Sequence, residues 1–556
     1  MRNFKPLNLF SDWVTNKLNS LSLEEKIGQL LHPNINPASS PSEIKELLLG
    51  VDVGGVFLFP GTAENYSKTI DFLQQHFNTP VIISSDLENG PGRTIQGATV
   101  FPDLMSLSAT DDETLAYSMG RSSALEGRSY GVHWAFGPVV DVNVNPNNPI
   151  TNTRSLGDNP DKISRLSCSL IRGMQENGLC ATIKHFPGDG LDDRDPHICT
   201  VVNPLSQDDW FKISGKTFQA AIDLGVWSVM IGHISLPAFE TNNEPNIPAQ
   251  VSKALITDLL RNKMGFDGLI ITDAIEMAGL RSFKPIDEIL VDTINAGCDM
   301  ILFSEMKRDF TILKKAVEEK KIPIERIDDA VRRILSLKET LGLHKDVEPK
   351  KVGKDELNSF RQMSQSIAEK AITMVKNDKN LIPLNLKKGS KLLSFHIRNS
   401  PENNVDLLDE LLKNEGYKIT RKTELDEKTF PLFDKLNQYE LILVNIVFKP
   451  TWGLGRIRIG GSFMRKLWFM MNTHRERMII TSFGSPYVLY DLPWVDTYIN
   501  AYSPDINTQK SVVDILLGRK EAIGTSPVDI FRAEKMKSYE ATIYRELTKT
   551  GCEKRV

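Results

Sequence analysis

The sequence has few of the features that mark the most easily recognised classes of protein. Lysine and arginine (67) nearly balance aspartate and glutamate (71), and the net charge of −4 gives no indication of a nucleic-acid partner. The cysteines are scattered and form no Cys-x-x-Cys pair, so neither a zinc site nor a disulfide framework is expected. They are Cys168, Cys180, Cys199, Cys298 and Cys552.

Long apolar runs are also missing. No run approaches the roughly 18 residues of a membrane-spanning helix, and the stretch from Met1 to Asn8 has no apolar core of signal-peptide length. We therefore expect a cytoplasmic protein with no membrane partner. The acidic loop 192–195 lacks EF-hand spacing, and Gly453–Gly461 lacks both forms of glycine-rich phosphate loop. Neither a metal nor an organic cofactor is expected.

The length and composition indicate a globular protein of more than one domain. Hydrophobic residues make up 40% and charged residues 25% of the chain, which is ordinary for a globular protein. A chain of 556 residues is too long for one typical core, so two or three domains are expected.

Short apolar runs alternate with helix-like stretches over the first 340 or so residues. Alternation of this kind predicts parallel strands joined by crossover helices, and about eight such units suit a (β/α)8 barrel, a TIM-type fold. A doubly wound open sheet gives the same pattern and stays an alternative. The runs are Ile27–His32, Val53–Phe59, Val81–Asp86, Trp134–Val142, Ala181–Phe186, Trp227–His233, Leu269–Asp273 and Met300–Phe303.

A polar, proline- and glycine-containing stretch at 348–354 separates this part of the chain from a second α/β pattern. We expect a barrel domain over 1–345, a linker over 346–360, a smaller α/β sandwich domain over 361–532, and a surface helix or tail over 533–556. The strands expected in the second domain are Lys391–His396, Leu441–Val447, Met478–Phe483 and Thr497–Ala501.

Unusual polar side chains come directly after the apolar runs. In a barrel the carboxyl ends of all strands share one face, so these side chains are expected to converge on one pocket. They are Asp86 and Glu88, Asp141 with Arg154 further along, Lys184 and His185, His233, and Asp273.

The most charge-rich stretch follows the run 181–186. It reads Lys-His-Phe-Pro-Gly-Asp-Gly from Lys184, then four residues, then Asp195-Pro196-His197. These residues resemble the signature of glycoside hydrolase family 3, and more narrowly of its β-N-acetylglucosaminidase branch, where the final triplet is Asp-(Ser/Thr)-His. Pro196 departs from that pattern. The stretch from Leu21 to Leu30 resembles the family's opening motif, and the resemblance extends, more loosely, through the second domain.

The resemblance implies roles for several residues. Asp273 ends a run similar to the family's nucleophile motif, and a helix-cap role is its structural alternative. His197, with Asp195 as its partner, would be the acid/base, because histidine titrates near neutral pH and a carboxylate orients it. The residues implied to bind sugar hydroxyls are Asp86, Arg93, Arg154, Lys184 and His185. His233 is equally suited to contacting the sugar or supporting its neighbours.

The implied function is that of a retaining exo-β-N-acetylglucosaminidase or β-N-acetylhexosaminidase acting on a small carbohydrate, a GlcNAc-containing oligosaccharide or muropeptide. A β-glucosidase or β-xylosidase, a GlcNAc phosphorylase and a catalytically silent sugar-binding protein are the alternatives. An aldolase-like barrel enzyme using Lys184 is less compatible with the neighbouring motif. The oligomeric state is not indicated.

Overall fold

The computed structural model describes residues 4, 6–240, 246–345, 350–423, 433–453, 455 and 457–530. By its internal contacts the chain divides into two compact units, Met1–Glu369 with Pro450–Ile457, and Lys370–Lys449 with Arg458–Val556. The segment Pro450–Ile457 therefore belongs to the first unit, although its neighbours on both sides in the sequence belong to the second.

Parallel strands in the first unit form a closed ring. Residues 31–35 form one strand interrupted at Pro33, its first part pairing with β13 and its second part with β3. A bridge between Ile271 and Met300 joins β12 to β13 and completes the ring of eight. The strands are, in ring order, β1 (Leu31–His32) with β2 (Asn34–Ile35), β3 (Gly55–Leu58), β5 (Ile82–Ser85), β7 (Trp134–Ala135), β8 (Cys180–Phe186), β10 (Ser228–Ile231), β12 (Leu269–Thr272) and β13 (Ile301–Leu302).

The ring confirms the expected TIM-type barrel and rules out the open-sheet alternative. Most barrel strands lie within the apolar runs seen in the sequence, because parallel strands covered on both faces bury nearly every residue. The run Ile27–His32 is the main exception: it is helical as far as Gln29, and its strand continues beyond it to Ile35. Two further strand pairs lie outside the ring, β4 (Gly61–Thr62) with β6 (Ile95–Gln96) and β9 (Val201–Val202) with β11 (Ile234–Ser235).

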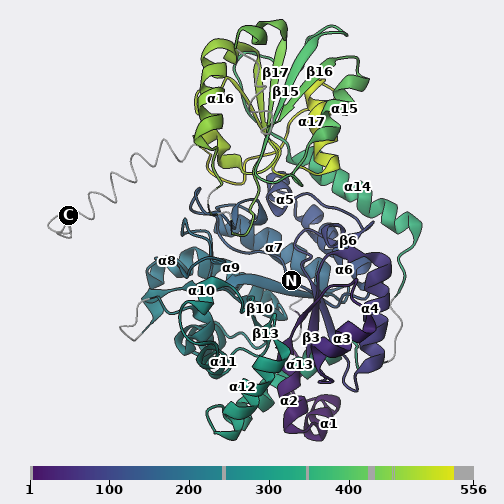
Figure 1. Cartoon of the computed structure of the whole chain (residues 1–556), viewed down its shortest axis with the longest axis vertical. Helices are drawn as coiled ribbons and strands as arrows, with labels where there is room; N and C mark the ends of the chain where they lie inside the picture. Colours follow the sequence, from purple (N-terminus) through teal and green to yellow (C-terminus); the bar gives the residue numbers. More distant parts are fainter. Residues whose placement is uncertain are drawn as a thin grey trace, which may run out of the picture. The chain divides into compact units, whose positions relative to one another are not determined.

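Helices precede, connect and follow the barrel strands (Figure 1). They are α1 (Asp12–Ser20), α2 (Leu23–Gln29), α3 (Pro41–Leu48), α4 (Ala63–His76), α5 (Leu104–Thr110), α6 (Glu113–Ser129), α7 (Pro160–Gln175), α8 (Gln207–Lys212), α9 (Ser214–Leu224), the π-helix η5 (Ala254–Lys263), α10 (Ala278–Arg281), α11 (Ile286–Ala296), α12 (Met306–Glu318), α13 (Ile324–Thr340) and α14 (Lys354–Ala371). Short 3-10 turns are η1 (Pro91–Arg93), η2 (Asn152–Arg154), η3 (Pro237–Phe239) and η4 (Ala249–Val251).

Local sequence explains where some of these helices begin. The Ser22 hydroxyl accepts from the Glu25 amide at 3.2 Å, and the Glu25 carboxylate accepts from the Ser22 amide at 2.8 Å, a capping box that starts α2. The same pairing of Ser40 and Glu43 starts α3. Both devices satisfy amides that a helix start otherwise leaves without partners.

The second unit is built on one six-stranded sheet. Its order is β14 (Thr373–Asn377), β19 (Thr497–Asn500), β18 (Met478–Ser482), β17 (Leu441–Val447), β15 (Lys391–Arg398) and β16 (Lys418–Thr423), with β14 antiparallel to its neighbour and the other pairs parallel. The expected strands occupy the four central positions. β14 and β16 were missed because they are edge strands whose residues are mostly half-exposed and so lack an apolar run.

Helices cover both faces of this sheet, as expected for an α/β sandwich. Figure 1 shows α16 (Gly461–His474) on one face, and α15 (Asp406–Asn414) with α17 (Ile506–Leu516) on the other. The unit has its own apolar core, separate from the core around the barrel. Its short turns are η7 (Phe433–Gln438), η8 (Arg475–Arg477) and η9 (Pro486–Tyr490).

The expected linker, 346–360, is described from residue 350 onward, and α14 begins within it at Lys354. The expected tail over 533–556 lies outside the described residues. The domain boundaries stay predictions. Among the described helices, none is both long enough and apolar enough to cross a membrane.

Candidate active site

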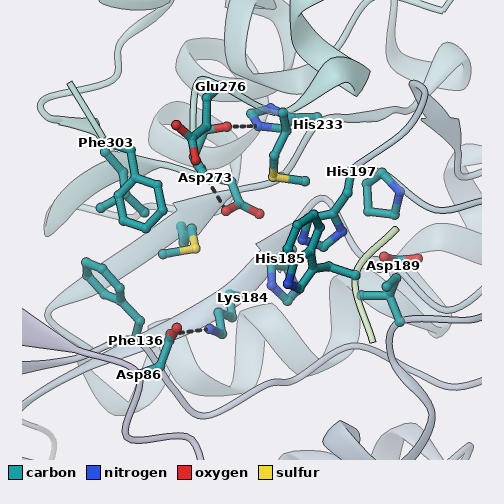
Figure 2. Close-up of a pocket in the computed structure, with 18 of the residues that line it drawn as sticks. Asp86, Phe136, Lys184, His185, Asp189, His197, His233, Asp273, Glu276 and Phe303 are labelled. Atoms are coloured by element: carbon teal, nitrogen blue, oxygen red, sulfur yellow. Dashed lines mark hydrogen bonds and ion pairs between the residues drawn. The ribbon is translucent and has the colours of Figure 1, made fainter. Parts of the chain in front are cut away.

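A cavity of about 780 Å³ opens where the barrel strands end at their carboxyl termini. Its walls come from the residues that end or follow β3, β5, β7, β8, β10, β12 and β13, together with Trp452 from the segment Pro450–Ile457. Figure 2 shows how these side chains surround one space. The carboxyl-terminal face is where barrel enzymes place their chemistry.

The cavity brings together most of the residues singled out in the sequence. Those that line it are Asp86, Arg154, Lys184, His185, His197, His233, Asp273 and Glu276. Asp195 is buried next to His197. Arg93 is not among the lining residues: its guanidinium is paired with Asp103 at 2.6 Å, because the turn η1 directs it there. A role of Arg93 in sugar binding stays a prediction.

Asp273 comes one residue after β12, in the wall of the cavity. Its amide donates to Ile231 O at 2.8 Å, which continues the pairing with β10, and its Oδ1 accepts from the Ala274 amide at 2.8 Å. Burial raises the pKa of this carboxyl, but the positive field of His185 and the Ala274 amide outweigh burial, so the pKa lies below its ordinary value. Asp273 is therefore an anion at neutral pH.

A network of ion pairs centres on Glu88, two residues after Asp86. Arg154 donates to both oxygens of Glu88, at 3.0 and 2.6 Å, and Lys184 Nζ lies 2.7 Å from Oε1. Lys184 Nζ also lies 3.3 Å from Asp86 (Figure 2). Burial opposes the charge on Glu88, yet Arg154 and Lys184 hold its pKa well below the ordinary value. Glu88 thus keeps two buried cations charged and in place.

His185 is fixed by a second carboxylate, Asp141. The ring Nδ1 lies 2.8 Å from Asp141 Oδ2, while Oδ1 accepts from the backbone amides of His185 (3.0 Å) and Asp189 (2.9 Å). A carboxylate at Nδ1 makes that nitrogen the donor and leaves Nε2 of His185 free to face the cavity. Asp189 is itself buried, and burial together with the charge of Asp141 raises its pKa to about 6.

His197 forms a dyad with Asp195. Its ring Nδ1 and its backbone amide both lie within hydrogen-bond distance of Asp195 Oδ1, at 2.7 and 2.9 Å. The Asp195 side chain is 1% exposed, whereas that of His197 is 31% exposed and faces the cavity. Burial raises the pKa of Asp195, but hydrogen bonds from His197 and from the Gly453 amide lower it overall. Asp195 is therefore a charged partner for the imidazole.

His233 contacts the backbone next to Asp273. It is fully buried, and its Nε2 donates to Ala274 O at 2.8 Å, which anchors the residue that follows Asp273. Burial lowers the pKa of His233, so its ring is neutral at pH 7. In the described part of the chain, no three His, Cys, Asp or Glu side chains are grouped in a way that would hold a metal ion.

Four phenylalanines form one wall of the cavity. Phe57 is at the centre of the group, with ring centroids 5.3, 5.7 and 5.2 Å from Phe59, Phe136 and Phe303. Sequence reasoning did not place this wall, because an aromatic ring near the end of a buried strand is indistinguishable from a core residue.

Four other residues contact the site without having been given a role from the sequence, although Glu88 and Asp141 were expected near the pocket. Glu88 and Asp141 both end strand-like runs, so their position was a usable signal, but nothing local shows which cations they meet. Trp452 and the neighbouring Gly453 lie far along the chain, and no pattern around them points to the barrel.

A parallel (β/α)8 barrel with ionised carboxylates around a pocket at its carboxyl-terminal face is compatible with a glycoside hydrolase. The family model described as "Glycosyl hydrolase family 3 N terminal domain" matches residues 22–337. The chain belongs to glycoside hydrolase family 3.

Two known proteins resemble it, one along nearly the whole chain and one over about three fifths of it. A "Beta-N-acetylglucosaminidase/beta-glucosidase" of Cellulomonas fimi is 33% identical over 550 residues, covering 95% of this chain and 97% of the relative. A "Beta-hexosaminidase A" of Pseudoalteromonas piscicida is 30% identical over 62% of each chain.

Two solved structures are similar in fold and sequence. "Beta-glucoside phosphorylase BglX bound to 2FGlc" superimposes with a TM-score of 0.88 at 32% identity, covering 95% of this chain and 99% of that one. A family 3 β-N-acetylglucosaminidase from Paenibacillus sp. str. FPU-7 superimposes with a TM-score of 0.81 at 27% identity, covering 92% and 99%.

Proposed function

We propose that this glycoside hydrolase is a retaining exo-β-N-acetylglucosaminidase, or β-N-acetylhexosaminidase, that removes terminal β-linked GlcNAc from small oligosaccharides or muropeptides. The observation that carries the proposal is the pairing of His197 with Asp195 at 2.7 Å beside the cavity that Asp273 also lines. A nucleophile and a separate proton donor around one sugar are the two parts that retaining hydrolysis requires.

Asp273 attacks C1 of the sugar and forms a covalent glycosyl-enzyme. Its lowered pKa keeps it ionised at neutral pH, as a nucleophile must be. His197 protonates the departing oxygen as the C1–O bond breaks, and later takes a proton from the water that releases the sugar from Asp273. Asp195 holds the imidazole in one tautomer and stabilises its charged form.

Charged side chains that line the cavity bind the sugar hydroxyls. Asp86 accepts hydrogen bonds, and Arg154, Lys184 and His185 donate them; each is held by a partner before the sugar arrives. Because Glu88 already balances Lys184 and Arg154, these cations are pre-organised for a neutral ligand.

Specificity for the N-acetyl group is supported by the names of the relatives and by the apolar part of the cavity. Met230 and Met277, both buried, line it near Asp273 and offer a surface suited to a methyl group. The Cellulomonas fimi relative carries both β-N-acetylglucosaminidase and β-glucosidase in its name, so β-glucosides are the competing substrates.

A panel of aryl glycosides tests this proposal. We expect aryl β-GlcNAc to be cleaved with a higher kcat/KM than aryl β-glucoside or β-xyloside, Asp273→Ala to abolish turnover, and a 2-fluoro sugar to label Asp273. His197→Ala should lose roughly 10²–10⁴-fold on substrates with poor leaving groups. A higher kcat/KM for the aryl β-glucoside would make β-glucosides the assigned substrates. Failure of the 2-fluoro sugar to label Asp273 would contradict the mechanism.

Phosphorolysis is the second candidate, favoured by similarity to a structure titled β-glucoside phosphorylase. In this reaction a phosphate oxygen, instead of water, attacks C1 of the glycosyl-enzyme, giving GlcNAc-1-phosphate and freeing Asp273. A neutral imidazole as acid/base would not repel an anionic acceptor as a carboxylate would. Comparing products with and without inorganic phosphate decides between them, and absence of the sugar phosphate would exclude phosphorolysis.

A further inference from the structure

The Asp195–His197 dyad is also contacted by Gly453, which comes from a distant part of the chain. Asp195 Oδ1 is occupied by the ring and the amide of His197, while Oδ2 accepts from the Gly453 amide at 2.8 Å. Gly453 lies in Pro450–Ile457, the segment that joins the barrel unit from the second half of the sequence. The buried carboxylate is thus held from two sides.

The loop that carries the dyad supplies no such donor of its own. Pro196, between Asp195 and His197, has neither a backbone N–H nor a hydroxyl. Within the described residues, Gly453 is the only hydrogen-bond partner of Asp195 Oδ2. Without it, a nearly buried carboxylate oxygen would lack a partner, which costs free energy.

Trp452, next to Gly453, is a large apolar side chain that is mostly exposed. Its side chain is 74% exposed, yet it lines the cavity, with its ring centroid 6.4 Å from that of His197. The apolar face of this indole is therefore accessible to a ligand that binds in the cavity beside His197.

We infer that Trp452 and Gly453 complete the active site on the leaving-group side: Gly453 positions the acid/base dyad, and Trp452 is the platform against which the departing ring lies. The inference rests on the proposed function, since it takes His197 as the proton donor. A proton donor must lie beside the oxygen of the leaving group. A side chain adjacent to His197 therefore borders the leaving group, whereas Lys184 and Arg154 hold the sugar that is retained.

The ligand class follows from the chemistry of an indole face. It packs against the C–H face of a pyranose or against an aryl ring, and offers little to a small alcohol or a halide. The preferred substrate is therefore a glycoside whose leaving group is itself a ring.

Trp452→Ala, Trp452→Phe and a control variant, Trp468→Ala, test the platform. Trp468 is also exposed, at 53%, but lies on α16 in the second unit. The measurement is the ratio of kcat/KM for a GlcNAc disaccharide to kcat/KM for GlcNAc β-fluoride, whose leaving group has no ring and needs no acid. We expect Trp452→Ala to lower this ratio roughly fivefold to tenfold, Trp452→Phe to restore most of it, and the control to leave it unchanged. An unchanged ratio in Trp452→Ala overturns the platform.

Gly453→Pro tests the positioning role by removing the donor N–H. Gly455→Pro is the matched control, because the two glycines have similar backbone angles (φ 76° and 74°) and proline strains both. We expect Gly453→Pro to lose activity selectively on poor leaving groups and to move the acid limb of the kcat/KM pH profile upward, because Asp195 has lost a hydrogen bond that lowers its pKa. Equal effects in the two variants would assign the loss to strain and overturn the role.

Two further variants separate this inference from the proposed function. If Asp195→Asn and His197→Ala keep full activity on the disaccharide, the dyad is not the acid/base and both proposals fall. If those variants lose activity while the Trp452 and Gly453 variants behave like wild type, only the inference made here is overturned.

Discussion

At the residue scale, charge balance in the cavity depends on Glu88. This carboxylate meets Arg154 at 2.6 Å and Lys184 at 2.7 Å, and the Lys184 side chain is only 4% exposed. Replacing one partner of a buried ion pair leaves the other charge uncompensated, which is strongly destabilising. This side of the cavity is therefore also a point on which stability depends.

Glu88→Gln should lower the free energy of unfolding by about 3 kcal/mol at pH 7. The pKa of Glu88 lies well below its ordinary value in the folded state, so its contribution is present above about pH 4.5 and is lost as pH falls further. Wild type and variant should converge in acid. Urea unfolding at pH 7 and pH 3 measures this, with the exposed Glu276→Gln as control; an equal difference at both pH values would contradict it.

At the scale of elements, two helices approach each other through glycines. α6 and α7 pack so closely that a Cβ on Gly173 would lie 2.1 Å from Tyr117 O, and one on Gly120 would lie 2.2 Å from Leu170 O. These contacts are to backbone atoms, which do not move aside independently of their helix.

Gly173→Ala should therefore destabilise the protein by about 1–3 kcal/mol, although alanine has the higher helix propensity. The control is Gly353→Ala, at a position where a Cβ would meet nothing within 4 Å. Thermal unfolding compares the two. A Gly173→Ala variant as stable as the control would show that the helices separate at no cost.

A second element-scale feature is Lys338, which α13 carries into the core. The side chain is fully buried, and its Nζ donates to Gln29 Oε1 at 2.5 Å. Burial lowers its pKa to about 7, so between about pH 7 and pH 10.5 the unfolded chain binds a proton that the folded chain does not. Stability should therefore rise with pH through this window.

Lys338→Met should remove that dependence. At pH 7 it relieves an ionisation penalty of about 4 kcal/mol and leaves Gln29 Oε1 without its partner at a cost of about 1–3 kcal/mol, for a net gain of about 2 kcal/mol. Near pH 10.5 the penalty has vanished, and the variant should be the less stable protein. Denaturant unfolding across this range tests the crossing; a constant difference between the two proteins would refute it.

At the scale of the whole molecule, each unit has its own apolar core. The cavity is lined entirely by residues of the first unit. A ligand that binds there stabilises the folded first unit by mass action and has no contact through which to stabilise the second directly.

Calorimetry should therefore resolve two unfolding transitions. A saturating sugar inhibitor should raise the temperature of the first unit's transition and leave that of the second unit unchanged. At a ligand concentration of 100 Kd the shift corresponds to about 2.7 kcal/mol. The same protein without the inhibitor provides the unliganded reference. A single transition, or an equal shift of two, would mean that the units unfold as one cooperative body.

The sequence predicted the barrel and the centre of the second sheet because their parallel strands are buried on both faces and so form short apolar runs. It placed Asp86, Lys184, His185 and Asp273 at one pocket because strand ends in a barrel share a face. The edge strands β14 and β16 escaped notice, since half-exposed strands carry no such run. The pairing of Arg93 with Asp103 was not predicted, because the path of a loop decides where its long side chain points.

What the sequence determined by itself is therefore the set of residues carried on buried strands, where periodicity and burial are local properties of the chain. Only the tertiary structure decided the partners: that Glu88 balances Lys184 and Arg154, that Asp141 orients His185, and that Gly453 holds Asp195. Each of these contacts joins residues far apart in the sequence. Such pairing depends on the distance and direction between side chains in the folded chain, which no local pattern contains.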